Sequence, residues 1–118
     1  MRIQVIGSGA SARTLRQYLK SAGYQAVESG GAYTVRMEEG EQANIVLEGV
    51  RGALAEETQR AVAELAGAPV EWRPAAAGSE RELRVIAGTG NRDAAERGVL
   101  RALLRVTGHG TKKKWKFF

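Results

Sequence analysis

Two glycine-containing turns carry the residues whose types and spacing indicate a binding site. The first, Gly7-Ser8-Gly9, follows the apolar residues 3–6 and precedes a stretch with helical spacing. Glycine permits a tight strand-to-helix turn and lets a ligand come close to the backbone. The free N–H groups and the positive dipole end of the following helix then attract an anion. This segment therefore predicts a phosphate-binding turn.

The second turn, Gly88-Thr89-Gly90, repeats the order of apolar strand, turn and helix. Asn91 is placed to cap the helix, and Asp93 complements its dipole. If the two preceding strands run parallel, both turns open at one edge of the sheet, where ligands of open α/β folds bind. Arg13 and Arg92 would then approach one cleft from two sides, with guanidinium groups suited to phosphate or carboxylate.

The first turn resembles the Rossmann dinucleotide-binding fingerprint over residues 2–28. Ala12 stands in place of the third glycine of that fingerprint, and Glu28 lies about 20 residues beyond the turn, where the family has its ribose-binding carboxylate. The resemblance implies an adenine nucleotide or dinucleotide ligand: NAD(H) first, NADP disfavoured by Glu28, and S-adenosylmethionine as an alternative. The other interpretation is a tight turn without a ligand. The candidate cofactor-binding residues are Gly7, Ser8, Gly9, Ala12, Arg13, Glu28, Gly88, Gly90 and Arg92.

Length and residue content restrict the chemistry. A chain of 118 residues is expected to form one domain, too short for a nucleotide domain joined to a full substrate domain. It has no cysteine and a single histidine, His109, so we expect no zinc or other transition-metal cluster within one chain. Neither glycine turn continues into a P-loop or a G-x-S-x-G motif. No self-contained active site is visible, and whether the protein is an enzyme stays open.

The expected location follows from the absence of targeting signals. The apolar run near the N-terminus is too short for a signal peptide, and no stretch approaches the ~18 apolar residues of a membrane span. The lack of cysteine is compatible with a reducing compartment. We therefore expect a cytoplasmic protein without a membrane span.

The positive charge is concentrated at the C-terminal end. The net charge is +5, and residues 92–118 hold eight of the 18 basic residues against two acidic ones. Arg97, Arg101 and Arg105 form a basic ridge at helical spacing, and the last seven residues combine four lysines with three of the seven aromatic residues. Such a segment indicates docking on its own domain or on a second copy, as in a homodimer, binding to a nucleic acid, or contact with a membrane surface. The alternative function is therefore a nucleic-acid or protein-interaction module that uses Arg97, Arg101, Arg105, Lys112, Lys113, Lys114, Trp115 and Lys116.

Hydrophobic spacing predicts alternating strands and helices. We expect helices near residues 10–22, 54–66 and 91–106, and strands at 2–6, 24–28, 33–37, 43–47, 70–73 and 82–87. Gly30-Gly31 has the composition of a hairpin turn, so one antiparallel hairpin is expected near residues 24–37. The predicted fold is a single-domain Rossmann-like three-layer α/β sandwich with a mixed, largely parallel sheet over residues 1–108, followed by a basic-aromatic tail at 109–118.

Overall fold

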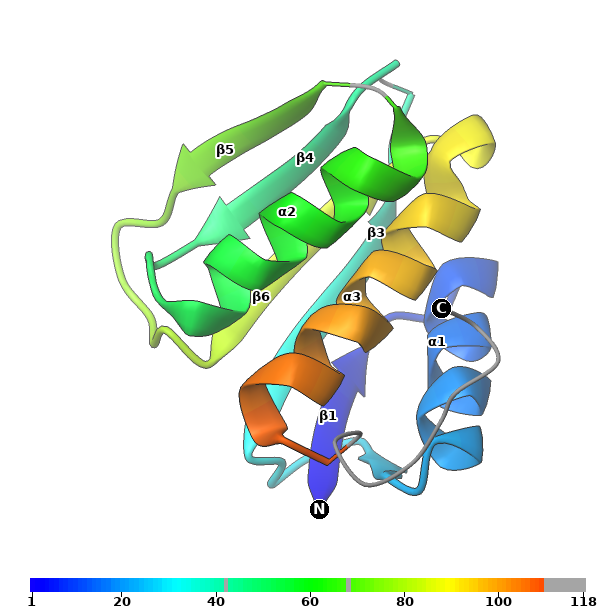
Figure 1. Cartoon of the computed structure of the whole chain (residues 1–118), viewed down its shortest axis with the longest axis vertical. Coiled ribbons are helices and arrows are strands. Elements are labelled where there is room, and N and C mark those ends of the chain that lie inside the picture. The colour runs from blue at the N-terminus through cyan, green and yellow to red at the C-terminus, as the bar shows by residue number, and fades with distance from the viewer. Residues whose placement is uncertain (42, 68, 110–118) are drawn as a thin grey trace.

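Strands and helices alternate along the chain in the computed structural model, which describes residues 1–41, 43–67 and 69–109 (Figure 1). All the expected helices and strands are present, with ends that shift by at most a few residues. A short 3-10 turn, Thr89–Asn91, precedes the last helix. The elements are β1 (Arg2–Ile6), α1 (Ala10–Ser21), β2 (Gln25–Val27), β3 (Tyr33–Glu39), β4 (Ile45–Gly49), α2 (Ala53–Ala66), β5 (Val70–Pro74), β6 (Glu82–Ala87) and α3 (Arg92–Thr107).

The six strands form one mixed sheet in the order β2-β1-β3-β6-β4-β5. β2, β1, β3 and β6 run parallel to their neighbours in this order, and β4 pairs parallel with β5. The antiparallel pairing is between β4 and β6, where Leu47 lies opposite Val85. The predicted mixed, largely parallel sheet is thus confirmed, although its antiparallel pair lies elsewhere than expected.

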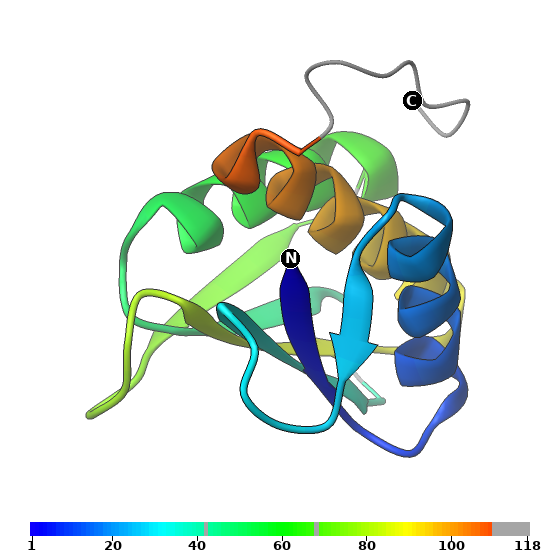
Figure 2. The ribbon, with the colours of Figure 1, turned by 90° about the horizontal axis from the view of Figure 1, so that it is seen from below.

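The prediction of an antiparallel hairpin near residues 24–37 is wrong. β2 and β3 lie on opposite sides of β1 and both run parallel to it, so the segment between them crosses β1. A Cβ atom on Gly31 would collide with the backbone nitrogen of Gln4. The loop passes on the side of the sheet away from the helices (Figure 2). Gly31 is therefore needed because two backbone segments cross closely here. In the sequence, a glycine required for such a crossing looks the same as a glycine required for a tight turn.

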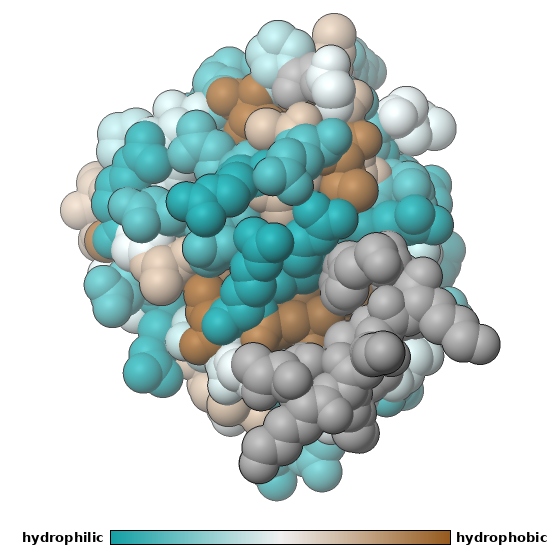
Figure 3. Space-filling view, in the orientation of Figure 1, coloured by the Kyte–Doolittle hydropathy of each residue, from teal (hydrophilic) through white to brown (hydrophobic). Residues whose placement is uncertain are grey.

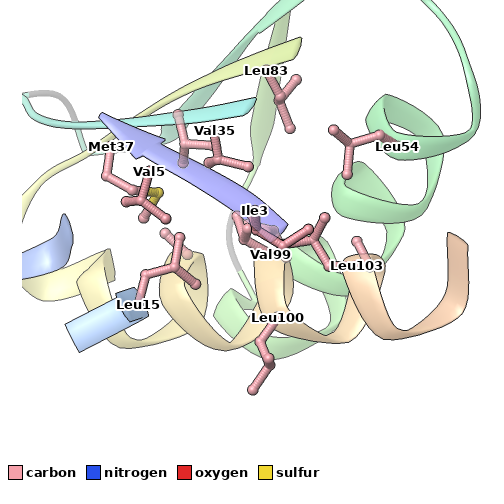
Figure 4. Packing of buried hydrophobic residues seen from close by; sticks show 14 of the residues in the cluster. Ile3, Val5, Leu15, Val35, Met37, Leu54, Leu83, Val99, Leu100 and Leu103 are labelled. Atoms are coloured by element: carbon pink, nitrogen blue, oxygen red, sulfur yellow. The ribbon is translucent and has the colours of Figure 1, made fainter. Parts of the chain in front are cut away.

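The three helices lie on one face of the sheet, so the fold has two layers and the expected three-layer sandwich is wrong (Figures 1 and 2). α3 packs between α1 and α2. Apolar side chains from alternate strand positions meet those of the helices in a single core, part of which is drawn in Figure 4. Its largest fully buried members include Ile3, Val5, Leu15, Val35, Leu54, Leu100 and Leu103.

The opposite face of the sheet carries polar and charged side chains, and no helix of the described residues 1–41, 43–67 and 69–109 covers it (Figure 2). Along β3, Val35 and Met37 are buried, whereas Thr34, Arg36 and Glu38 between them are half-buried or exposed. This alternation is the pattern of a sheet with one covered face and one open face. We call the helix-free side the open face.

Candidate functional site

Both glycine turns open at the same edge of the sheet, as expected if their strands are parallel. β1, β3 and β6 are consecutive parallel neighbours, so their carboxyl ends lie together. The first turn leads from β1 into α1 and the second from β6 into α3, which brings the N-termini of two helices to this edge. We call it the carboxyl edge.

Gly7 is required by the close packing of three elements. Its φ of +144° lies in a region that side chains rarely adopt, and a Cβ atom there would be 2.6 Å from the carbonyl oxygen of Met37. The same atom would lie 3.0 Å from the Cβ of Ala12, which is fully buried. Ala12 therefore occupies a position where a larger residue would push α1 away from β1 and β3.

Gly9 is the N-cap residue of α1, and no side chain caps the helix at this position. Its φ of −81° is accessible to any residue. A Cβ atom on Gly9 would lie 3.3 Å from the carboxylate oxygen Oε1 of Glu39. The space beside Gly9, through which a phosphate would approach, is thus bordered by an acidic side chain.

Glu39 was not identified from the sequence as a site residue, because residues 38–42 have the composition of a polar turn. The structure extends β3 to Glu39, which lies opposite Ala87 of β6, and the Gly40 N–H donates to the Ala87 carbonyl oxygen over 3.1 Å. Alternation along the strand places Glu39 on the same face as Val35 and Met37, below the start of α1. That alternation is the sequence signal that could have found it.

The other predicted residues around the first turn are exposed. Ser8 and Arg13 face solvent, and Glu28 lies one residue beyond β2 at the carboxyl edge, also exposed. Arg16, which sequence reasoning did not single out, reaches back from α1: its Nη2 donates to the carbonyl oxygens of Val5, at 3.1 Å, and Gly7, at 2.8 Å. A half-buried guanidinium is therefore held against the turn.

The second turn is tied to β4. Gly88 is buried in an extended conformation, whereas Gly90 has no atom within 4 Å of a Cβ position. Asn91 stands at the N-cap of α3, but its side chain does not cap the helix as expected. Its Nδ2 donates instead to the carbonyl oxygen of Ala43, at 2.6 Å. The amide therefore anchors the turn to the segment that leads into β4.

A buried carboxylate lies where α1 and α3 begin. The Glu96 side chain is only 4% exposed, and its Oε2 is 3.5 Å from Nε of Arg92. Burial raises the pKa of Glu96, while the hydroxyl of Ser11 and the charge of Arg92 offset part of that rise. Ser11 is itself buried. Arg92 is thus directed toward Glu96, which reduces its availability for an external anion.

Glu96 should make stability depend on pH. Because its folded-state pKa is raised, the fold binds a proton more readily than the unfolded chain, and stability falls as the pH rises from about 4.5 through the folded-state pKa. We expect Glu96→Gln to remove this dependence, so that the variant gains stability relative to the wild type over the same rise in pH. Urea unfolding across pH 4 to 8 measures it. The control is the exposed Glu56, whose change to Gln should leave the slope unaltered; an equal slope in all three proteins would contradict the expectation.

The predicted basic ridge on α3 is balanced by carboxylates. Arg97 pairs with Asp93 at 3.3 Å, Arg101 with Glu64 at 2.9 Å, and Arg105 with Glu57 at 3.1 Å. Glu57 and Glu64 belong to α2, so two of these ion pairs join the helices. Hydrophilic residues run across this face of the molecule (Figure 3). The ridge is therefore part of the α2–α3 interface rather than an unbalanced positive surface.

The rest of the predicted nucleic-acid surface, Lys112–Lys114, Trp115 and Lys116, lies outside the described residues, as do Phe117 and Phe118. The described chain ends at His109, whose ring centroid is 4.5 Å from that of Tyr24. The Tyr24 hydroxyl also lies 2.7 Å from Oγ1 of Thr107. The end of α3 is thus attached to the segment between α1 and β2.

Comparisons with known proteins identify no relative: no family model, curated protein or solved structure matches the chain. Within residues 1–41, 43–67 and 69–109, no three histidine, cysteine or acidic residues are grouped as metal ligands would be. In the same part of the chain, each helix is too short or too polar to cross a bilayer.

Proposed function

We propose that this protein is a small nucleotide-binding or nucleotide-sensing module, with NAD(H) as the first candidate ligand and the carboxyl edge as its site. The observation that carries the proposal is the meeting of two glycine turns and two helix N-termini at one edge of a parallel β1-β3-β6 unit. The β1-α1-β2 unit, with β2 parallel to β1, also has the connectivity of the Rossmann fingerprint.

The geometry modifies the roles expected from that resemblance. Both carboxylates are exposed, but Glu39 lies beside Gly9, whereas Glu28 lies one residue beyond the short β2. A phosphate that docks at the start of α1 would displace the Glu39 carboxylate from Gly9. We therefore assign the sugar hydroxyls to Glu39, which would accept their hydrogen bonds after that movement, and leave Glu28 at the periphery.

Thermal unfolding with NAD, NADH, NADP, S-adenosylmethionine and ATP tests this function. A ligand at about 100 times its dissociation constant stabilises a fold by about 2.7 kcal/mol, which raises the Tm of a domain of this size by several degrees. We expect such a shift with NAD or NADH and a smaller one with NADP. No shift with any of the five at millimolar concentration would exclude the nucleotide function.

Variants then locate the ligand. Gly9→Val should abolish the shift, because the added side chain fills the approach to the helix N-terminus. Glu39→Ala should weaken binding about tenfold or more, as expected for a lost hydrogen bond to a charged group, and Glu28→Ala should change it little. A large loss in Glu28→Ala with none in Glu39→Ala would restore the assignment that the resemblance implies.

The alternative, an interaction module built on α3, has less support. Arg97, Arg101 and Arg105 are each ion-paired, so a nucleic-acid phosphate would have to compete with Asp93, Glu64 and Glu57. The remaining residues of that prediction lie beyond His109, outside the described chain.

A further inference from the structure

The open face carries an unusual pair of like charges. The strand register places Arg36 of β3 directly beside Arg84 of β6. Like charges on paired strand positions are unfavourable. Arg84 is neutralised: its Nε and Nη2 donate to Glu38 at 2.7 and 2.9 Å, and its Nη1 donates to Glu48 at 3.3 Å. The Arg84 hydrogen bonds lower the pKa of Glu38 and keep it ionised.

Arg36 differs from its neighbour. Its side chain is exposed and makes no ion pair or hydrogen bond with the residues that the structure describes, although its charge helps to lower the pKa of Glu38 on the same strand. Glu82, diagonal to it on β6, is likewise without an ion-pair partner in the described chain. A cation and an anion thus stand on adjacent strands without contacting each other.

Both side chains line one hollow of about 200 Å³. Its floor is the open face at β1, β3, β4 and β6, and its wall is the segment between β5 and β6. Thr34, Ser79 and the apolar Ile6 also line the hollow, whereas the side chain of Leu83 packs into the core on the covered face. The hollow therefore offers both charges, residues that carry hydroxyl groups and an apolar side chain.

The wall is held in place by backbone hydrogen bonds at both ends. The Ala75 N–H donates to the Gly49 carbonyl oxygen and the Thr34 N–H to the Arg81 carbonyl oxygen, each over 2.9 Å. The Glu82 N–H donates to the Ser79 carbonyl oxygen over 3.0 Å. The segment is thus anchored to β3 and β4, on both sides of β6, and the hollow is a built feature of the sheet.

We propose that this hollow binds a small amino-acid-like zwitterion, with its carboxylate on Arg36 and its ammonium group on Glu82. A simple anion would meet Glu82 and Glu48, and a simple amine would meet Arg36 and Arg84. A zwitterion satisfies both unpaired charges, and a guanidinium binds a carboxylate in a bidentate manner. An engineered cavity of ~150 Å³ holds benzene, so this volume suits a ligand of about ten non-hydrogen atoms or fewer.

Amide NMR spectra of the intact chain test the proposal with alanine and serine as probes, and with propionate and ethylamine as single-charge controls. We expect both amino acids to shift the amides near residues 34–36 and 79–84, and each control compound to bind at least about tenfold more weakly, as expected for one lost charged hydrogen bond. Equal binding of propionate and alanine, or no shift at tens of millimolar amino acid, would overturn it.

Charge-matched variants separate the hollow from the rest of the surface. Arg36→Gln and Glu82→Gln should each weaken amino-acid binding about tenfold or more, whereas Lys20→Gln and Glu56→Gln, at exposed positions on α1 and α2, should not. The site does not depend on the carboxyl edge, so the Arg36 and Glu82 variants should retain any nucleotide-induced Tm shift. Amino-acid binding unchanged in both hollow variants would disprove the assignment.

Discussion

Gly7→Ala should lower the free energy of unfolding by about 3 kcal/mol or more. An alanine there would have to adopt the φ of +144° or force the turn open, and its Cβ would press on the backbone oxygen of Met37. Backbone strain and overpacking each cost about 1–3 kcal/mol. The Met37 oxygen belongs to β3 itself, so relief would require a shift of the sheet. Urea unfolding monitored by circular dichroism measures the loss.

Gly9→Ala is the matched control for this prediction. Its φ of −81° suits alanine, and its neighbour is the far end of the flexible Glu39 side chain. We expect a cost below about 1 kcal/mol, which reflects the poorer N-cap propensity of alanine. Similar losses at both positions would mean that the turn is governed by backbone entropy and not by the contact between Gly7 and β3.

Gly98→Ala should destabilise the interface between α2 and α3, with a loss of about 2 kcal/mol. Gly98 lies in α3 where it crosses α2, and a Cβ atom there would collide with Cγ2 of Val62 and lie 3.1 Å from its backbone nitrogen. Alanine gains up to ~1 kcal/mol in helix propensity, but overpacking costs about 1–3 kcal/mol and here involves backbone as well as side-chain atoms.

A double-mutant cycle with Val62→Ala checks the cause. Removal of the Val62 methyl groups creates space for the new alanine, so the double variant should lose less stability than the sum of the single losses. Gly90→Ala serves as the control, because its Cβ would meet no atom within 4 Å and its φ is not positive. Additive losses would show that the two helices do not meet at Gly98 and Val62.

Hydrophobic periodicity was sufficient to predict the α-helices and strands that the structure describes, because it depends on residues close together in the chain. It could not predict the pairing of strands. Gly30-Gly31 satisfies a hairpin turn as well as a loop that crosses β1, and only the position of β3 beyond β1 decides between them. The covered face of the sheet was equally undetermined, since the same helices could lie on one side or on both.

In the candidate site, too, local features were predicted and contacts between distant elements were not. The shared edge of the two glycine turns follows from parallel strands and was predicted on that condition. Glu39 and Glu96 were missed because their importance comes from contact with a second element, Gly9 for the exposed Glu39 and the start of α1 for the buried Glu96, which composition does not reveal. Arg101 and Arg105 of α3 were interpreted as part of a free ridge because their partners on α2 lie 37 and 48 residues away in the chain.

Until β6 is made, the sheet consists of two separate parts. The β2-β1-β3 and β4-β5 units both precede β6 in the chain, yet they join only through it, since β6 lies between β3 and β4. During synthesis the facing edges of β3 and β4 would therefore stay unpaired, and unpaired strand edges promote association between chains. Pairing of β6 with both closes the sheet through contacts distant in sequence, a slow kind of step. The order of the strands thus implies that the sheet of the domain cannot be completed until its last strand, β6, has been synthesised.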